Sequence, residues 1–220
     1  KYESDPRWQF GRPPVGNANY AWLQHMLWKL RPGGQAGVVL ANGSMSSNAG
    51  GEGQIREAMV RGDVVEVMVA LPGQLFLNTQ IPVCLWFLTN DKTMNGRNRR
   101  GETLFIDASQ LGTMETRVLK VFTDEDIAKI QEIVQLWKTG EGYEDVTGFC
   151  KSASLEEIEK KGFILTPGRY VGTDDFSEDD EDWQFKITTL TEKFVDLSAR
   201  SSELDQRINE ALGKITDETT

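Results

Sequence analysis

Residues 64–88 read Val-Val-Glu-Val-Met-Val-Ala-Leu-Pro-Gly-Gln-Leu-Phe-Leu-Asn-Thr-Gln-Ile-Pro-Val-Cys-Leu-Trp-Phe-Leu, and they carry the strongest fold signal in the chain. Two apolar runs, at 64–71 and 81–88, flank a link that begins with Pro72-Gly73. Near-continuous apolar runs of this length predict strands buried on both faces. Because the link of about ten residues is short for a crossover helix, we predict that these two strands are antiparallel.

Further strands and helices flank this pair. Residues 36–40 form a Val-rich run that ends in a turn, and residues 103–106 form a fourth short apolar run. Helices are predicted from Asn17 to about residue 30 and from Glu52 to Val60. Strands that alternate with helices predict parallel neighbours covered on both faces. We therefore expect an α/β fold, in which a mostly parallel, Rossmann-like sheet has an antiparallel hairpin at one edge and continues into strands upstream.

After residue 110 the pattern becomes helical. Thr123 and Asp126 fit a capping box that starts a helix to about residue 138, and a second short helix is predicted at 154–161. Residues 163–171 are expected to form an extended strap. The expected segments are the sheet at 1–110, a helical and strap extension at 111–172, an acidic linker at 173–182 and a long helix at 183–216.

A heptad pattern marks the last of these segments. Its apolar seam, broken by the polar Ser201, is formed by Ile187, Leu190, Phe194, Leu197, Leu204 and Ile208. An apolar stripe of this kind must pack against another surface. That surface is either the protein's own domain or a second chain. The acidic linker favours a coiled-coil or bundle contact with a partner, because it allows the helix to move away from the domain.

Charge is distributed unevenly along the chain. The net charge is −10, but residues 1–100 carry 11 Lys and Arg against 7 Asp and Glu, whereas residues 101–220 carry 13 against 27. The acidic total argues against a general nucleic-acid coat protein, but it leaves room for a basic face in the first half. Arg97, Arg99 and Arg100 fall in one predicted loop and are candidates for phosphate contact, with a solvated turn as the alternative.

Composition excludes several other classes. No run of about 18 apolar residues is present, so no membrane-spanning segment is expected, and we predict a cytoplasmic protein. The single histidine and the two cysteines, Cys84 and Cys150, have no spacing that fits a zinc site. Cys84 lies in an apolar run, so we expect a buried free thiol.

The segment 71–88 resembles the late motif of N6-adenine DNA methyltransferases, in the form found in the modification subunit of type I restriction-modification systems. Residues 5–11, 16–22, 37–43 and 165–171 resemble the same subunit in the same order. The resemblance implies a class I methyltransferase sheet and methyl transfer from S-adenosylmethionine to a flipped adenine. The glycine-rich cofactor loop and the Asn-Pro-Pro-Phe turn of that family are absent. The chain is therefore expected to be the C-terminal portion of the subunit, which does not bind the cofactor or turn over alone.

The resemblance also assigns site residues and partners. Phe76 is expected to stack on the flipped base, with filling of the core as the alternative. Asn78, Thr79 and Gln80, which follow it, and Asn42, at the end of a strand, are candidates for the target pocket. The implied partners are DNA, a specificity subunit that docks on the C-terminal helix, and a restriction subunit. The alternative function is a non-catalytic assembly module, and a dinucleotide oxidoreductase is disfavoured because no phosphate loop is present.

Overall fold

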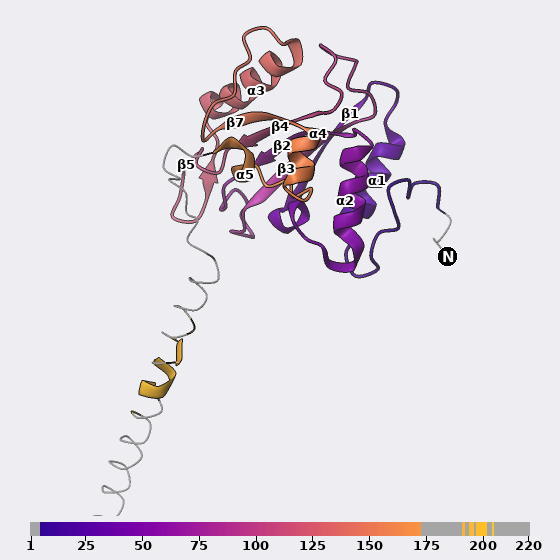
Figure 1. The fold of residues 1–220 in the computed structure, drawn as a ribbon. Coiled ribbons are helices and arrows are strands. Elements are labelled where there is room, and N and C mark those ends of the chain that lie inside the picture. Colours follow the sequence, from indigo (N-terminus) through magenta and orange to yellow (C-terminus); the bar gives the residue numbers. More distant parts are fainter. Residues whose placement is uncertain (1–4, 173–190, 192–193, 196, 202–203, 205–220) are drawn as a thin grey trace, which may run out of the picture. The chain divides into compact units, whose positions relative to one another are not determined.

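A computed structural model describes residues 5–172, together with 191, 194–195, 197–201 and 204. The chain divides into two compact units, Lys1–Asp174 and Asp175–Thr220. The described part of the first unit contains a five-stranded sheet of order β1-β3-β2-β4-β7 (Figure 1). Its strands are β1 (Gln35–Ala41), β2 (Val65–Ala70), β3 (Val83–Thr89), β4 (Glu102–Asp107) and β7 (Cys150–Ser154).

Helices cover both faces of this sheet. Figure 1 shows α3 on one face and α1 and α2 on the other. The α-helices are α1 (Asn19–Lys29), α2 (Glu52–Arg61), α3 (Asp124–Thr139), α4 (Leu155–Lys160) and α5 (Gly168–Val171). Two 3-10 turns, η1 (Asn42–Met45) and η2 (Ala49–Gly51), follow β1, and a small hairpin of β5 (Thr113–Met114) and β6 (Lys120–Val121) precedes α3.

The strand order differs from the expectation in one important respect. The antiparallel pairing of β2 with β3 is confirmed. However, β1 and β2 are not parallel neighbours, because β3 lies between them and is antiparallel to both. Among the described strands only β2 and β4 pair in parallel, and β4 pairs with β7 in the antiparallel direction. The sheet is therefore mixed rather than mostly parallel, and the β2–β3 pair lies inside it rather than at an edge.

Burial explains why β3 takes an inner position. Five of its seven residues are buried, including Cys84 and Trp86, and the other two pack against the core on the opposite face. A strand with apolar side chains on both faces is stable where neighbours and helices cover it on every side. The expectation failed because chain order does not reveal which strands become neighbours.

Two apolar cores lie on the two sides of the sheet. One lies between the sheet and α1 and α2, and it contains Tyr20, Met59 and Trp86. The other lies between the sheet and α3, and it contains Leu104 and Trp137. Burial of each large apolar side chain contributes about 1.5–3 kcal/mol. These cores fix the sheet, and with it the loops at its two ends.

The region after β4 is partly as expected. The capping box of Thr123 and Asp126 at the start of α3 is confirmed, and Ser154 caps α4. The expected strap at 163–171 is not fully extended, because its end forms α5. Within it Tyr170 stacks on Phe105 of β4, with ring centroids 3.7 Å apart and planes 6° from parallel. The strap is therefore part of the core packing.

The second unit is described at only a few positions. Residues 191, 194–195, 197–201 and 204 are helical. Phe194, Leu197 and Leu204 are 71%, 62% and 55% exposed. Three predicted seam residues, Ile187, Leu190 and Ile208, lie outside the described residues. Among the described helices, none has the length and apolar character needed to cross a membrane.

Candidate functional site

The loop at residues 72–82 joins β2 to β3 and has a tightly closed base. The Leu71 N–H donates to the Val83 carbonyl at 2.9 Å, and the Gln74 N–H donates to the Gln80 carbonyl at 3.2 Å. A Cβ atom at Gly73 would lie 2.5 Å from that Gln80 carbonyl oxygen. Close approach of backbone to backbone therefore requires glycine at this position.

The tip of this loop is a two-residue turn that projects from the protein. Phe76 and Thr79 form an isolated antiparallel bridge, with Leu77 and Asn78 between them. Leu75 packs into the core beneath α3, whereas Phe76 belongs to neither core and is 41% exposed. This exposure contradicts the alternative that Phe76 only fills the core. An aromatic face is thus presented at the surface.

Three polar candidates share the turn with Phe76. Asn78 and Gln80 are exposed, and Thr79 is half-buried with its Oγ1 accepting from the Ile81 N–H at 3.4 Å. Amide side chains offer both donors and acceptors. The structure therefore brings a π-face and amide groups together on one short loop.

Asn42 lies at the same end of the strands as the 72–82 loop. It begins η1 directly after β1, and its neighbour Ala41 pairs with Val83 at the start of β3, where the 72–82 loop ends. The Asn42 Oδ1 is buried and has no hydrogen-bond partner within the described residues. An unpaired buried acceptor costs about 1–3 kcal/mol, so a bound donor here would be stabilised.

The β5–β6 hairpin supports the loop and was not anticipated. The Lys120 N–H donates to the Gln74 carbonyl at 2.8 Å, which places the hairpin against the base of the loop. Arg117 is exposed in the turn of the hairpin. With two paired residues on each side, the hairpin is too short to give a periodic signal in the sequence.

The three predicted phosphate ligands lie at the other end of the sheet. Arg97, Arg99 and Arg100 belong to the connection from the end of β3 to the start of β4, whereas the Phe76 loop leads into β3. Seven residues of β3 separate the two ends, which corresponds to roughly 20 Å. The arginines and Phe76 therefore do not form one site.

The three arginines also differ in environment. Arg99 is 0% exposed and pairs with Glu66 at 3.0 Å, so it does not reach a phosphate from this position and the prediction is corrected for this residue. Arg97 forms two hydrogen bonds to Glu102, at 2.8 and 2.6 Å. These bonds hold the pKa of Glu102 below its ordinary value. Arg100 is exposed, with its guanidinium 4.0 Å from Asp91.

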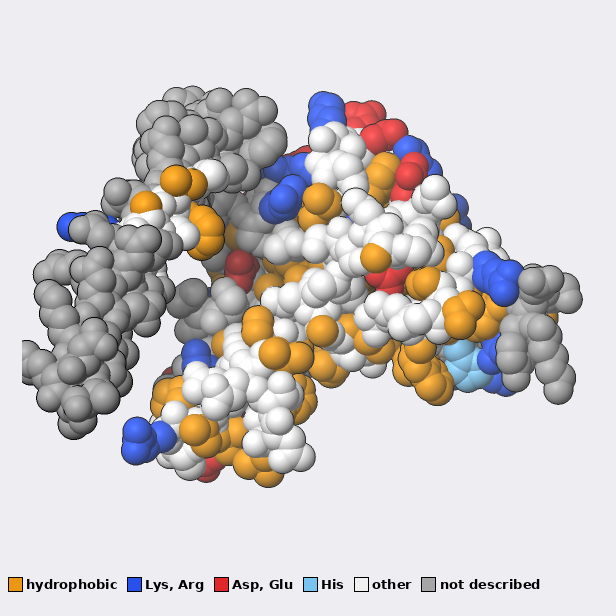
Figure 2. Space-filling model, turned by 90° about the horizontal axis from the view of Figure 1, so that it is seen from below, with side chains coloured by type: hydrophobic (Ala, Val, Ile, Leu, Met, Phe, Trp, Pro, Cys, Tyr) orange, Lys and Arg blue, Asp and Glu red, His pale blue; other side chains and the backbone are white. Residues whose placement is uncertain are grey.

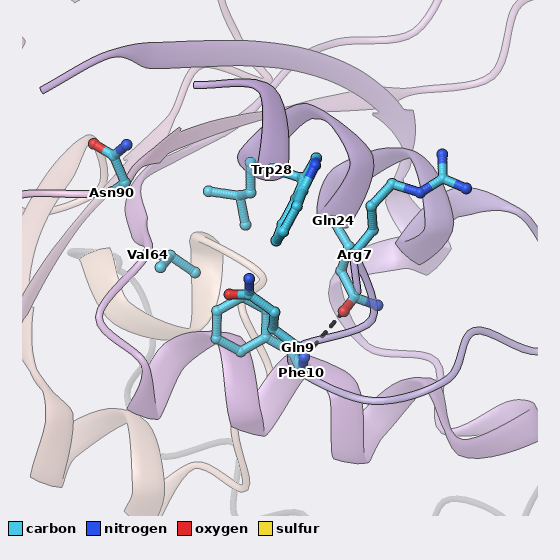
Figure 3. A pocket seen from close by; sticks show the side chains of 8 residues that line it. Arg7, Gln9, Phe10, Gln24, Trp28, Val64 and Asn90 are labelled. Carbon is cyan, nitrogen blue, oxygen red and sulfur yellow. Dashed lines mark hydrogen bonds between the residues drawn. The ribbon is translucent and has the colours of Figure 1, made fainter. Parts of the chain in front are cut away.

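A second hollow lies away from the 72–82 loop. Figure 3 shows a cavity between the 7–10 segment and α1. Its volume is about 170 Å³, and beside it the Phe10 N–H donates to Gln24 Oε1 at 3.0 Å. Its lining residues Val64 and Asn90 place it at the sheet end away from Phe76. His25 is visible at the surface in Figure 2, and its Nδ1 lies 2.9 Å from the Arg7 guanidinium.

A metal site is not found among the described residues. No cluster of three or more His, Cys, Asp or Glu side chains is found in this part of the chain. The glycine-rich turn before α2 is filled by protein, because a Cβ at Gly50 would meet Pro14 at 2.8 Å and one at Gly53 would meet Asn48 at 2.2 Å. These two glycines therefore allow close packing within the turn.

The fold is thus an α/β domain with a mixed sheet, and it presents an exposed aromatic residue on a loop at one end of the strands. Residues 1–179 match the N-6 DNA methylase family, and the chain belongs to this family. It is 53% identical over 209 residues to the HindI methylase subunit, a type I restriction enzyme subunit of Haemophilus influenzae. It is 36% identical over 215 residues to the MjaIX methylase subunit of Methanocaldococcus jannaschii.

A solved structure agrees with this assignment. The type I restriction-modification methyltransferase subunit of Streptococcus thermophilus superposes with a TM-score of 0.66 and 30% identity, over 77% of this chain and 34% of that one. The alignments cover 95% of this chain but 46% of the HindI subunit, and 94% of this chain but 38% of the MjaIX subunit. The chain thus spans less than half the length of these relatives.

Proposed function

We propose that this chain is part of the modification subunit of a type I restriction-modification system, a DNA methyltransferase specific for adenine N6. The family match over residues 1–179 carries the proposal, and the exposed Phe76 loop supports it. S-Adenosylmethionine supplies the methyl group in such a reaction. We infer that it is held by parts of the subunit that this chain does not span, since the sequence lacks the family's glycine-rich cofactor loop and covers less than half the length of its relatives.

Phe76 is the residue that receives the target base. An adenine that leaves the duplex loses its stacking partners, and an exposed aromatic face replaces them with about 1–3 kcal/mol per base. Phe76 is 41% exposed on a loop whose base is closed by backbone hydrogen bonds. A ring held in this way loses little conformational entropy when the base binds.

The amide side chains near Phe76 recognise the edge of the base. Adenine presents an amino donor beside ring-nitrogen acceptors, and Asn or Gln complements such a pair. Asn78 and Gln80 are exposed on the same turn, and the Asn42 Oδ1 is without a partner in the described chain. Thr79 contributes a hydroxyl to the same pocket.

The C-terminal helix is the contact for the specificity subunit, and through the assembled enzyme the chain meets DNA and the restriction subunit. The exposed side chains of Phe194, Leu197 and Leu204 support this role, because they follow the heptad seam of the sequence. Large apolar side chains exposed in register mark a helix that packs on a partner.

The reaction is tested with the complete subunit bound to its specificity subunit. Transfer of labelled methyl groups from S-adenosylmethionine to duplex DNA is measured for Phe76→Ala, Phe76→Tyr and, as a control, Val15→Ala, which changes a side chain 96% exposed. Loss of the stacking energy predicts that kcat/KM falls about 5- to 150-fold in Phe76→Ala. Phe76→Tyr and Val15→Ala should retain activity, and an unchanged Phe76→Ala would contradict the assignment.

A second function, a non-catalytic assembly module, is favoured by the exposed seam at Phe194 and Leu197. It predicts that the complete subunit binds its specificity subunit but transfers no methyl group. Calorimetry of the 220-residue chain measures whether this chain alone binds S-adenosylmethionine. We expect no heat of binding with S-adenosylmethionine, and a micromolar Kd would show that the cofactor is held by this chain after all.

A further inference from the structure

We propose that Leu77 is a wedge that enters the DNA base stack in the place vacated by the flipped adenine. The inference rests on the proposed function, because it requires a base that leaves the duplex. It adds a residue with a separate role: Phe76 holds the base outside the helix, and Leu77 keeps the gap closed.

Leu77 is unusually exposed for an apolar residue on an anchored loop. Its side chain is 85% exposed, compared with 41% for Phe76 and 54% for Ile81. Apolar surface stabilises a fold only when it is removed from water, so the fold gains little from a leucine that stays exposed here. In the described part of the chain nothing covers this side chain, and a functional contact explains its presence better than packing does.

The loop holds Leu77 in a fixed position. The turn is closed by the Phe76–Thr79 bridge. At the base of the loop the Gln74 N–H donates to the Gln80 carbonyl, and the Gln74 carbonyl accepts from the Lys120 N–H. Leu75 is packed into the core. Phe76 is one of the two bridge residues and Leu77 is the first residue of the turn itself, so the two side chains leave neighbouring but different positions of the loop tip.

The chemistry of the gap suits an aliphatic side chain. Flipping removes one base from the stack and costs a few kcal/mol of unstacking and unpairing. Side chains such as Leu, Ile, Met and Phe enter base steps elsewhere and recover part of this cost by contact with the neighbouring bases. A leucine in the gap also opposes return of the adenine, so the extruded state becomes more populated.

The hairpin that meets the base of the loop has two exposed charged residues in its turn, Arg117 and Glu115. The β5–β6 hairpin lies against the base of the loop through the Lys120 N–H, and Arg117 is exposed in its turn. Arg117 makes no ion pair or hydrogen bond through its side chain within the described residues. A guanidinium on the hairpin that supports this loop favours DNA as the occupant, because phosphates flank the stacked bases of a duplex.

The experiment uses the complete subunit with its specificity subunit and a duplex that carries 2-aminopurine at the target adenine. Fluorescence reports the extruded base, and labelled methyl transfer is measured on the unmodified site. Leu77→Ala should reduce both the fluorescence increase and methylation about tenfold. Leu77→Met, which keeps an apolar side chain, and the exposed control Val15→Ala should retain both.

A mismatched partner opposite the target adenine provides the decisive comparison. Extrusion of an unpaired base costs less, so the mismatch should restore Leu77→Ala to within about twofold of the unaltered enzyme. Equal loss on matched and mismatched duplexes would overturn the wedge, as would unchanged extrusion in Leu77→Ala while Phe76→Ala is impaired. A variant that no longer binds its specificity subunit would assign Leu77 to a protein contact. Absence of methylation by the unaltered enzyme would instead refute the proposed function.

Discussion

The guanidinium of Arg99 donates to the carboxylate of Glu66 at 3.0 Å, with 0% and 1% of the two side chains exposed. Arg99 also donates to the Met94 carbonyl at 2.8 Å, and the Gln35 amide donates to the other oxygen of Glu66 at 2.6 Å. The pair connects the loop between β3 and β4 to the central strand β2. A residue predicted to meet phosphate is therefore part of the internal structure.

Replacing this arginine should be strongly destabilising. Arg99→Ala leaves the Glu66 carboxylate buried without its main partner, and loss of one member of a buried pair costs about 3–5 kcal/mol. Arg100→Ala is the matched control, because it removes an exposed arginine one residue away and should cost less than about 0.5 kcal/mol. Urea denaturation of the chain measures both. Similar values for the two variants would show that the buried pair does not stabilise the fold.

Glu102 should make stability depend on pH. Its two hydrogen bonds from Arg97, and one from the Ser152 hydroxyl at 3.1 Å, hold the pKa of Glu102 below its ordinary value. A carboxyl with a lowered pKa in the folded state stabilises the protein above its unfolded pKa and loses that contribution as pH falls through the folded value. Because the pair is partly exposed, the contribution is about 0.5–1 kcal/mol.

The measurement compares the unaltered chain with Glu102→Gln between pH 7 and pH 3. The difference in unfolding free energy should be full at pH 7 and should shrink below about pH 4.5, near the unfolded pKa of a glutamate. Glu115→Gln, on the exposed β5–β6 hairpin, should show little difference at either pH. A difference for Glu102→Gln that does not change with pH would contradict the assignment.

Local sequence patterns predict elements formed by neighbouring residues, but they do not predict pairs of residues that are far apart in the chain. The apolar runs of β2 and β3 and the capping box at Thr123 depend on nearby residues, so their patterns predict them. The local sequence around Arg99 does not reveal that this residue is buried, because its partner Glu66 is 33 positions away. A signal was available, since Glu66 interrupts the apolar run at 64–71, and a charge in a buried strand requires a partner.

The same reasoning applies to the strands. β7 has the polar sequence Cys-Lys-Ser-Ala-Ser, which lacks a strand pattern, and it forms because β4 offers a free edge for pairing. The candidate loop could be predicted because its motif is contiguous, from Leu71 to Leu88, and its role as a site stays a prediction. The support it receives from the Lys120 N–H is a contact across 46 positions, and no local pattern encodes such a contact.

Gly73→Ala should impair the site more than the fold. The added Cβ would meet the Gln80 carbonyl oxygen at 2.5 Å, and this oxygen belongs to backbone that already accepts from Gln74. Overpacking of this kind costs about 1–3 kcal/mol and displaces the loop that carries Phe76. In the complete enzyme, methylation should fall at least about tenfold, because small displacements of a site cost large factors in rate.

The control for this change is Gly16→Ala, whose Cβ would meet nothing within 4 Å. Methyl transfer and thermal unfolding are measured for both variants in parallel. Normal methylation by Gly73→Ala would indicate that the loop adapts to the extra atom and that its closed base is not required.

The two thiols should be unreactive in the folded chain. Cys84 and Cys150 are 0% and 1% exposed, and desolvation raises the pKa of each thiol above its ordinary value. Because the thiolate is the reactive form, a disulfide reagent at mildly alkaline pH should modify neither cysteine in native buffer and both in a denaturing concentration of guanidinium. Fast modification of one thiol in the native chain would place it at the surface.

The C-terminal helix should lose its partner when the seam is charged. The double variant Leu197→Asp and Leu204→Asp places carboxylates where the heptad pattern puts apolar contacts, and burial of an unpaired charge at an interface is prohibitive. The complete subunit should then fail to co-purify with its specificity subunit while its thermal unfolding stays unchanged, since both leucines are exposed in this chain. Val195→Asp is the matched control, because Val195 is a helical, 60% exposed residue beside the seam rather than in it. Persistence of the complex in the double variant would show that the specificity subunit binds elsewhere, and loss of the complex in Val195→Asp as well would show that the heptad register does not define the contact.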